Sequence, residues 1–222
     1  MGRLIVIEGL DGVGKATQTA LLEEKLKDSG ASVKRVSFPD YASPASAPLK
    51  MYLGGQLGQK PADVGAYAAS CFFAVDRYAS YKTGWEEDYL GDTLIICDRY
   101  ATSNFPFQLP KLKREEWDAF IAFENDFEYN KLMLPSPSLV IYLSMQPDFA
   151  RKLMNKRYEG DKSKMDLHES DVSYQLECYE AAEYACEKLG WSKICCTEDG
   201  ELRSVEEISR EVYDTVAASG LV

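Results

Sequence analysis

Short apolar runs alternate along this chain with longer amphipathic stretches. Most of the runs are too short for helices and lack polar interruptions, as in strands buried on both faces of a sheet. We expect strands at Leu4–Ile7, Val33–Ser37, Thr93–Cys97, Leu139–Leu143 and Lys193–Cys196. The stretches between them predict helices at Thr17–Lys27, Pro61–Lys82, Arg114–Lys131, Pro147–Asn155, Val172–Leu189 and Ser204–Ala217. This alternation predicts an α/β fold with a central five-stranded parallel sheet and helices on both faces.

The length of 222 residues suits one α/β domain with a modest insertion. Ligands of parallel sheets bind beyond the carboxyl ends of the strands. One stretch that could cover such a ligand is Lys156–Asp171, which is charged, contains glycine and lacks a strong apolar period. It is either a solvated loop or a mobile lid. We predict a single domain over residues 1–222 with a mobile lid at about residues 152–171.

The chain is acidic, with 36 Asp and Glu against 25 Lys and Arg and a net charge of −11. We therefore expect no broad contact with nucleic acid or with an anionic membrane. The first apolar run stops at Glu8, which is too short for a secretion signal or a membrane span, so we expect a cytoplasmic protein. The six cysteines should then be reduced, and none forms the C-x-x-C pair of a zinc site.

A glycine-rich loop follows the first expected strand and precedes the first expected helix. Its sequence, GLDGVGK over residues 9–15, is typical of a P-loop, whose backbone amides surround phosphate oxygens while the lysine reaches the β- and γ-phosphates. A glycine-rich turn without a ligand is the alternative. The predicted ATP-binding residues are Gly9, Leu10, Asp11, Gly12, Val13, Gly14, Lys15, Ala16 and Thr17.

One position departs from the P-loop pattern. A Ser or Thr that contacts Mg²⁺ normally follows the lysine, and here that residue is Ala16. Thr17 is not an equivalent substitute, because one residue along a helix rotates a side chain by about 100°. Magnesium would then be held by phosphates, water and carboxylates elsewhere. Alternatively, Ala16 marks a degenerate nucleotide switch that does not catalyse.

The third expected strand ends in Cys97-Asp98-Arg99-Tyr100, where side chains meet the ligand crevice. An aspartate here can orient Mg²⁺ through water, and an arginine can clamp a phosphate with two hydrogen bonds. As a purely structural alternative, Asp98 and Arg99 could form an ion pair with each other.

Four motifs in order give the chain a family resemblance. They are Gly9–Lys15, Phe38-Pro39, the run FAVDR over residues 73–77, and the run DRYATSN over residues 98–104. Together they resemble the thymidylate kinases over essentially the whole chain. The resemblance implies a P-loop NTPase fold, the substrates ATP and dTMP, and Mg²⁺ as the cofactor. It also implies a homodimer, for which the apolar helix Ala66–Tyr81 is a reasonable interface.

The resemblance assigns the thymine contacts first. Phe73 matches the aromatic residue that stacks on the base, and Arg77 matches the arginine that donates to a thymine carbonyl. Their i, i+4 spacing puts both on one helix face. Ser103 and Asn104 resemble the polar residues around the base. Without the resemblance, Phe73 would be a core aromatic residue and Arg77 a solvated charge.

The remaining dTMP contacts also follow from the resemblance. Asp11 matches the P-loop aspartate near the sugar hydroxyl and the metal, and Phe38 matches a wall of the acceptor site. Tyr41 stands where members carry an arginine or a tyrosine on the acceptor phosphate. Phe107 stands where several members have a tyrosine that senses the absent 2′-hydroxyl, so selectivity for deoxyribose is less firmly predicted. Asp11 and Asp98 are the predicted metal carboxylates, with water between if necessary.

Phosphoryl transfer requires positive charge around the moving group. Members of the family without an arginine in the P-loop tend to carry basic residues in the lid, and this chain has Gly12 at that position. The candidates are Lys152, Lys156, Arg157, Lys162 and Lys164. We prefer Arg157, because a guanidinium can bridge two phosphates. With it, the predicted catalytic residues are Lys15, Asp98, Arg99 and Arg157.

The D-x-x-E pattern of Asp166 and Glu169 matches the segment that follows the family's lid and places Glu169 near the metal or the sugar. The alternative is a capped helix start. We expect His168 at the surface, and Thr197–Gly200 in the place where the family's backbone borders the adenine.

The predicted function is transfer of the γ-phosphate of ATP to dTMP, which gives dTDP and ADP. A kinase of another deoxynucleotide or deoxynucleoside is the enzymatic alternative. A non-catalytic P-loop module that regulates a partner is the other alternative; Ala16 favours it, and a second nucleotide pocket argues against it. All of these residue assignments require that Lys15 and Arg99 face one cavity.

Overall fold

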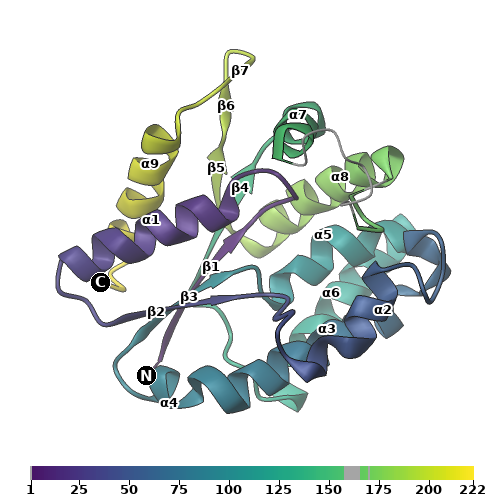
Figure 1. The fold of residues 1–222 in the computed structure, drawn as a ribbon, viewed down its shortest axis with the longest axis horizontal. Helices are drawn as coiled ribbons and strands as arrows, with labels where there is room; N and C mark the ends of the chain where they lie inside the picture. Colours follow the sequence, from purple (N-terminus) through teal and green to yellow (C-terminus); the bar gives the residue numbers. More distant parts are fainter. Residues whose placement is uncertain (1, 158–165, 170) are drawn as a thin grey trace.

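A central parallel sheet organises the protein, as a computed structural model shows for residues 2–157, 166–169 and 171–222. The strands are β1 (Arg3–Glu8), β2 (Val33–Ser37), β3 (Leu94–Asp98), β4 (Leu139–Ser144) and β5 (Ser192–Cys195). Their order across the sheet is β2-β3-β1-β4-β5, and every neighbouring pair is parallel (Figure 1). All five expected strands are confirmed, and no strand boundary differs by more than one residue from the expected one.

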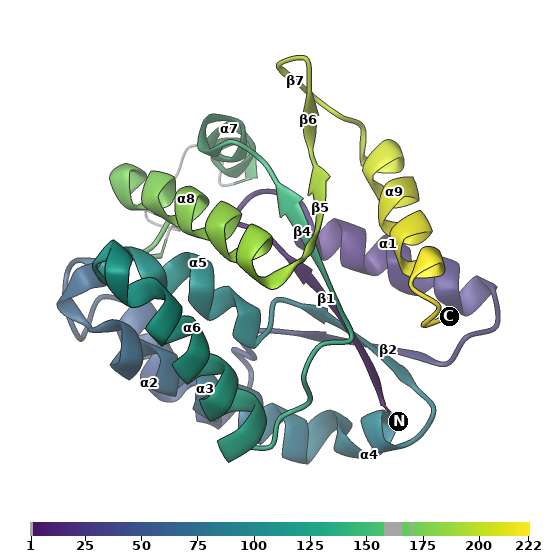
Figure 2. The same ribbon diagram turned by 180° about the vertical axis from the view of Figure 1, so that it is seen from behind.

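The helices form a layer on each face of the sheet, as the two opposite views show (Figures 1 and 2). One layer contains α1 (Lys15–Asp28) and α9 (Val205–Ala218), and the other contains α3 (Ala66–Ser80), α5 (Asn104–Gln108), α6 (Trp117–Asn125) and α8 (Val172–Leu189). Successive residues of β1 therefore enter two different cores: Ile5 and Ile7 pack with α1 and α9, while Leu4 and Val6 pack on the opposite face. This explains why the run contains no polar residue.

The long expected helix at Pro61–Lys82 consists of several pieces. A 3₁₀ turn at Pro61–Asp63 precedes α3, and the π-helical turn Tyr81–Trp85 joins α3 to α4 (Glu86–Leu90). Gly65 separates the first two pieces as the N-cap of α3. The expected helix at Arg114–Lys131 is instead continuous, because the 3₁₀ turn Arg114–Glu116, α6 and the π-helical turn Asp126–Lys131 follow one another directly.

Several short elements were not expected. They are α2 (Ala47–Leu53), α5, the 3₁₀ turns Pro44–Ser46, Ala101–Ser103 and Leu109–Lys111, and the hairpin strands β6 (Thr197–Glu198) and β7 (Glu201–Leu202). Asp199 and Gly200 turn the hairpin with φ values of 49° and 79°, the left-handed pair that a two-residue turn requires. The hairpin projects beyond the edge of the sheet (Figure 1). It occupies the place for which an adenine contact was predicted, and that role remains a prediction.

The predicted lid falls between α7 (Pro147–Arg157) and α8, and residues 158–165 and 170 of it lie outside the described part. Lys162 and Lys164 are among them, and the side chains of Lys156 and Arg157 are likewise not described. The assignment of Arg157 therefore stays a prediction. Across the described ranges, no helix combines the length and the apolar character needed to cross a bilayer.

Candidate active site

The loop between β1 and α1 has the backbone shape of a phosphate-binding loop. Gly9, Gly12 and Gly14 have φ values of 153°, 83° and 92°, which side-chain-bearing residues rarely adopt. Lys15 is only 7% exposed, and its Nζ donates to the carbonyl oxygen of Leu10 at 2.6 Å. The lysine thus turns back over its own loop, where an incoming phosphate oxygen can replace that carbonyl.

Gly12 leaves no room for a side chain, because α7 packs against it. A Cβ there would lie 2.7 Å from Cγ of Met154 and 2.8 Å from the carbonyl oxygen of Ala150. An arginine at this position would need α7 to move away. The P-loop and the helix that leads into the predicted lid are therefore in direct contact.

Lys15 and Arg99 border the same cavity, as the sequence assignments require. Asp11, Asp98 and Ala16 line this cavity too. The exposed Thr17 is also a lining residue, so the P-loop residues after the lysine do face the cavity. We call this space the phosphate cavity.

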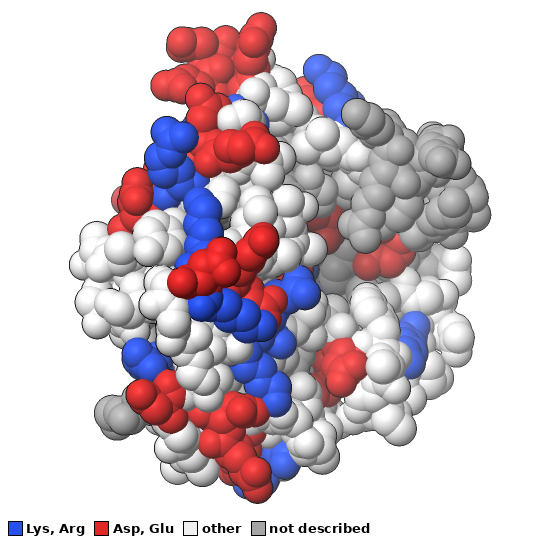
Figure 3. Space-filling model, turned by 60° about the vertical axis from the view of Figure 1, so that its left-hand side comes forward, with Lys and Arg blue, Asp and Glu red and all other residues white. Residues whose placement is uncertain are grey.

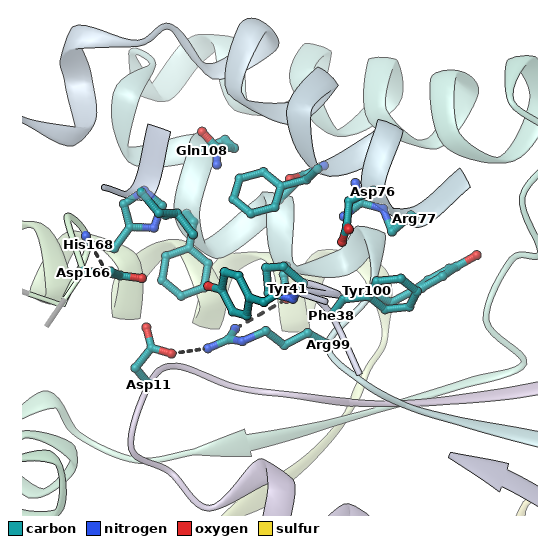
Figure 4. A pocket seen from close by; sticks show the side chains of 16 residues that line it. Asp11, Phe38, Tyr41, Asp76, Arg77, Arg99, Tyr100, Gln108, Asp166 and His168 are labelled. Carbon is teal, nitrogen blue, oxygen red and sulfur yellow. Dashed lines mark hydrogen bonds and ion pairs between the residues drawn. The ribbon is translucent and has the colours of Figure 1, made fainter. Parts of the chain in front are cut away.

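Arg99 is held by the P-loop rather than by its neighbour Asp98. Its Nη2 forms a short ion pair with Asp11 (Figure 4). Its Nη1 donates to the carbonyl oxygen of Gly9 at 3.1 Å. Nη1 also lies 3.5 Å from Oε1 of the buried Glu8. The backbone of Arg99 is left-handed, with a φ of 65°, which is uncommon for a residue with a side chain and typical of functional sites. The alternative pairing of Asp98 with Arg99 is wrong.

These charges shift one another's pKa values. Burial lowers the pKa of Lys15 to about 8, and the nearby Arg99 cation adds to that effect. Burial would raise the pKa of Asp11, but the positive charges of Arg99 and Lys15 outweigh it and lower the pKa overall. Two cations and one carboxylate therefore stay ionised in a place with little water, which suits a polyphosphate.

A second cavity adjoins the first and shares six lining residues with it, namely Asp11, Phe38, Pro39, Tyr41, Arg99 and Asp166. We call it the base cavity. It is lined by all the predicted dTMP residues except Glu169, namely Asp11, Phe38, Tyr41, Phe73, Arg77, Arg99, Ser103, Asn104 and Phe107. Figure 4 shows Asp76 and Arg77 at the side opposite Asp11 and Arg99, with Phe38 and Tyr41 between them. Glu169 lines the phosphate cavity instead.

The structure distinguishes between the two interpretations of Phe73 and Arg77 on α3, as base contacts or as ordinary core and surface residues. Arg77 is 2% exposed and pairs with the buried Glu128, so it is not a solvated charge. Phe73 packs beside the cluster of Leu49 and Tyr52, and it also lines the base cavity. Phe73 is therefore both a packing residue and a cavity residue.

Ser103 and Asn104 are held from behind by carboxylates. The Ser103 hydroxyl donates to Glu8 at 2.8 Å, and Thr102 donates to the same carboxylate at 2.8 Å. Glu8, which also accepts from the backbone N–H of Gly9 at 2.9 Å, thereby joins the P-loop to the start of the DRYATSN segment. Glu8 was not singled out in the sequence, although its charge at the end of an apolar strand is a signal.

His168 lies in the interior, so the expectation of a surface position is wrong. It is 4% exposed, and its Nε2 lies 2.6 Å from the Tyr52 hydroxyl, to which Lys111 donates at 2.6 Å. The Tyr52 hydroxyl therefore accepts from Lys111 and also shares a hydrogen bond with the imidazole. The ring stacks on Phe107 with 5.2 Å between centroids and 12° between planes. Burial and the Lys111 charge lower the pKa of His168 to about 3.

Asp166 and Glu169 form a turn of their own. Oδ1 of Asp166 accepts from the backbone N–H groups of His168 and Glu169 at 2.8 and 2.9 Å. The cap of α8 is Asp171, whose side chain accepts from the N–H of Tyr174, so the alternative that Asp166 and Glu169 begin the helix is wrong. Burial and the nearby Asp11 raise the pKa of Asp166 to about 7.

Gln108 is a cavity residue that the sequence analysis missed. It is fully buried, and neither its Oε1 nor its Nε2 has a hydrogen-bond partner among the described residues. Figure 4 shows its amide at the edge of the base cavity. A buried amide without partners costs free energy unless a ligand or water satisfies it. In the sequence, the only indication of this role was that Gln108 directly follows Phe107, a predicted dTMP contact.

The described residues contain no group of three or more His, Cys, Asp or Glu side chains placed to bind a metal ion. The carboxylates of Asp11 and Asp98 do reach the phosphate cavity. Asp11 is engaged by Arg99, whereas the Asp98 carboxylate makes no hydrogen bond to the described part of the chain. Lys152 is exposed, and its Nζ lies 5.1 Å from the centre of the Phe149 ring.

The phosphate cavity at the P-loop shares Arg99 and Asp11 with the adjoining base cavity. This arrangement defines the class of protein, a P-loop kinase of nucleoside monophosphates. The family model of thymidylate kinase matches residues 7–207. The chain belongs to the thymidylate kinase family.

Known proteins agree with this assignment. The human thymidylate kinase is 32% identical over 162 residues, which is 72% of this chain and 70% of that protein. The Mycobacterium tuberculosis enzyme is 29% identical over 174 residues, or 78% and 80% of the two chains. The solved structure of thymidylate kinase from Candida albicans has a TM-score of 0.68 at 19% identity and covers 99% of this chain and 93% of that one, which shows the same fold.

The close packing of α7 on the P-loop yields a first prediction. Gly12→Ala should raise the KM for ATP, because its methyl group would collide with Met154 and Ala150 in addition to straining a left-handed backbone. Gly14→Ala is the matched control: its φ of 92° is equally strained, but nothing lies within 4 Å of the added methyl. We expect the loss in kcat/KM for ATP to be roughly tenfold larger for Gly12→Ala. Equal losses would show that the contact with α7 is unimportant.

The buried imidazole yields a second prediction. The folded state keeps His168 neutral, whereas the unfolded chain takes up a proton below its ordinary pKa of about 6.5, so stability falls as the pH falls from 6.5 towards 3. Between pH 7.5 and pH 5 this amounts to about 2 kcal/mol. His168→Gln, whose amide can still form a hydrogen bond with Tyr52, should lose that much less stability over this range in urea unfolding. An unchanged pH dependence would contradict neutral burial of the ring.

Proposed function

We propose that this protein transfers the γ-phosphate of ATP to dTMP and releases dTDP and ADP. The supporting observation is that Lys15 and Arg99 border one cavity while the base cavity opens beside them. Lys15 and the loop amides hold the β- and γ-phosphates. Arg99 turns from Asp11 to the acceptor phosphate, and Tyr41 and Glu169 flank the path between the two sites.

No general base is needed for this reaction. The second pKa of a phosphate monoester is near 6, so the acceptor is mostly a dianion at pH 7. The protein has to align the two nucleotides, neutralise the charge on the moving group and exclude water. Lys15 and Arg99 supply two of the positive charges. We propose that Arg157 in a lid at about residues 152–171 supplies another.

The base cavity supports thymine as the base. Phe73 offers a flat apolar face, and Arg77 and the unpartnered amide of Gln108 offer polar contacts to its edge. Asn104 adds a third polar contact, and Phe107 also lines the cavity. These side chains complete the dTMP site that the family resemblance assigns.

Magnesium is the proposed cofactor. The residues fit the ion in part. The Asp98 carboxylate lines the phosphate cavity and makes no hydrogen bond to the described part of the chain, and Asp11 lines the same cavity. The ion would neutralise the negative charge on the donor phosphates. Since Ala16 cannot ligate it, water molecules and the phosphates would provide most of the ligands.

A homodimer is also proposed, with α3 at the interface. Tyr67, Val75 and Tyr78 are large apolar residues on α3 with exposures of 44%, 52% and 43%. The exposed Cys71 lies on the same helix. Burial of these side chains against a second copy would remove them from water. Sedimentation as a monomer at micromolar concentration would exclude this arrangement.

The test of the activity is a steady-state assay with ATP and dTMP, dUMP, dCMP, dGMP or thymidine. We expect dTMP to give the highest kcat/KM, and equal turnover of thymidine would overturn the assignment. Lys15→Ala should lower dTDP formation by roughly a hundredfold or more, because a preorganised cation on the transferring group is lost. Retained far-UV circular dichroism is the control. A fully active Lys15→Ala variant would rule out the P-loop mechanism.

The metal assignment has its own test. Asp98→Asn removes the charge that would orient Mg²⁺ and keeps the shape of the side chain. We expect the Mg²⁺ concentration for half-maximal velocity to rise by about tenfold, while the KM for dTMP changes little. The reverse pattern, a raised KM for dTMP with an unchanged Mg²⁺ requirement, would assign Asp98 to the acceptor site.

A further inference from the structure

Two buried glutamates lie behind the base cavity. Glu124 belongs to α6 and Glu128 to the π-helical turn that continues it, and their exposures are 1% and 0%. Neither is among the described residues that line the cavity. A buried carboxylate is costly unless charged or hydrogen-bonding partners compensate it. The hydrogen-bond partners of Glu128 and Glu124 are Arg77 and Asn104, which do line the cavity, whereas Oε1 of Glu124 has no partner among the described residues.

Glu128 holds Arg77 along one edge of the guanidinium group. Nε of Arg77 lies 3.2 Å from Oε2, and Nη2 forms a shorter contact with Oε1. This paired arrangement fixes the plane of the group. Nη1 makes no hydrogen bond to a described residue, so its two N–H donors are left for a ligand in the base cavity.

Glu124 holds Asn104 in a similar way. Nδ2 of Asn104 donates to Oε2 of Glu124 at 2.6 Å. An ionised carboxylate only accepts, so the amide NH₂ faces the glutamate, and the amide oxygen is directed away from it as an acceptor. Burial, together with the Glu128 charge, raises the pKa of Glu124 to about 7. At pH 8 the carboxylate is thus mostly ionised and this orientation is fixed.

We propose that Glu128 and Glu124 determine base specificity from outside the cavity, by holding Arg77 as a hydrogen-bond donor and Asn104 as an acceptor. They are positioning residues. This proposal rests on the proposed function, in which Arg77 and Asn104 contact the base.

The resulting pattern matches one type of pyrimidine. Thymine presents the carbonyl oxygen O4 beside the ring N3–H, an acceptor next to a donor. Cytosine presents an amino group beside a bare ring nitrogen, the reverse order. Arg77 cannot accept a hydrogen bond, and Asn104 cannot turn its NH₂ to the ring while Glu124 holds it. A cytidine nucleotide would leave these buried groups unsatisfied, which is a strong basis for rejection.

The first test is Glu128→Gln, assayed at pH 8 beside the wild-type protein. We expect the KM for dTMP to rise roughly tenfold or more, because Arg77 loses the partner that aims it, while the KM for ATP stays within about twofold. The matched control is Asp118→Asn, which removes a carboxylate of the same helix whose ion pair to Lys188 at 2.8 Å lies away from the cavity. A general loosening of the helix would affect the control and both substrates.

The second test is Glu124→Gln, whose amide can donate as well as accept and so lets Asn104 reverse. We expect the ratio of kcat/KM for dTMP to that for dCMP to fall roughly tenfold. If Glu128→Gln does not fold, we compare Arg77→Gln with the double variant Arg77→Gln/Glu128→Gln. Because Glu128 acts only through Arg77, we expect these two variants to have equal KM values for dTMP.

The outcomes separate this proposal from the proposed function. A wild-type protein that does not phosphorylate dTMP refutes the function. A wild-type protein that phosphorylates dTMP, with glutamate variants that keep its KM for dTMP and its selectivity against dCMP, refutes only the role of the two glutamates. A double variant that binds dTMP more weakly than Arg77→Gln also refutes it.

Discussion

The site depends on keeping two cations, Lys15 and Arg99, close together where little water can screen them. Their mutual repulsion is visible in the pKa of Lys15, which burial lowers to about 8 with a further contribution from Arg99. Two carboxylates compensate: the partly exposed Asp11 pairs with Arg99, and the buried Glu8 lies behind both the P-loop and the DRYATSN segment. Phosphate oxygens can replace the Asp11 contact of Arg99 and the Leu10 contact of Lys15. The fold thus holds in place the charges that the reaction needs.

The arrangement of strands explains why these groups meet. β1 ends at Glu8 and β3 ends at Asp98, and the two are neighbouring parallel strands in register, with Ile7 opposite Asp98. The P-loop and Arg99 therefore leave the same edge of the sheet side by side. The backbone N–H of Arg99 even donates to the carbonyl oxygen of Ile7 at 3.2 Å. A parallel sheet of this order brings residues that are about 90 positions apart in sequence into one cavity without any long connection.

The sequence predicted the elements with a strong period and the residues inside known motifs. It failed where local pattern carries little information. α5 has only five residues and contains Pro106, so propensity argued against a helix whose contacts with α8 nevertheless hold it. The hydrophobic pattern predicts an exposed position for His168 and suggests no role for Gln108. Both are buried by tertiary contacts. Likewise Glu128 lies 51 residues from Arg77, a pairing that a single sequence cannot reveal.

An acidic protein binds two anionic substrates here because the attraction is local. The chain has a net charge of −11, yet on the face shown in Figure 3 described Lys and Arg side chains lie among Asp and Glu side chains. Screening by salt limits such surface charges to about 10 Å, whereas buried groups escape most of it. The base cavity adds buried hydrogen-bonding groups to these charges. Asp76 is buried there with an unpartnered Oδ1, and Gln108 is buried with an unpartnered amide, so the cavity carries unsatisfied hydrogen-bonding groups that a nucleotide with matching polar edges can relieve. Recognition of the acceptor base therefore uses buried polar groups that have no hydrogen-bond partner in the protein. Recognition of the phosphates uses the positive charges of Lys15 and Arg99, which nearby carboxylates offset.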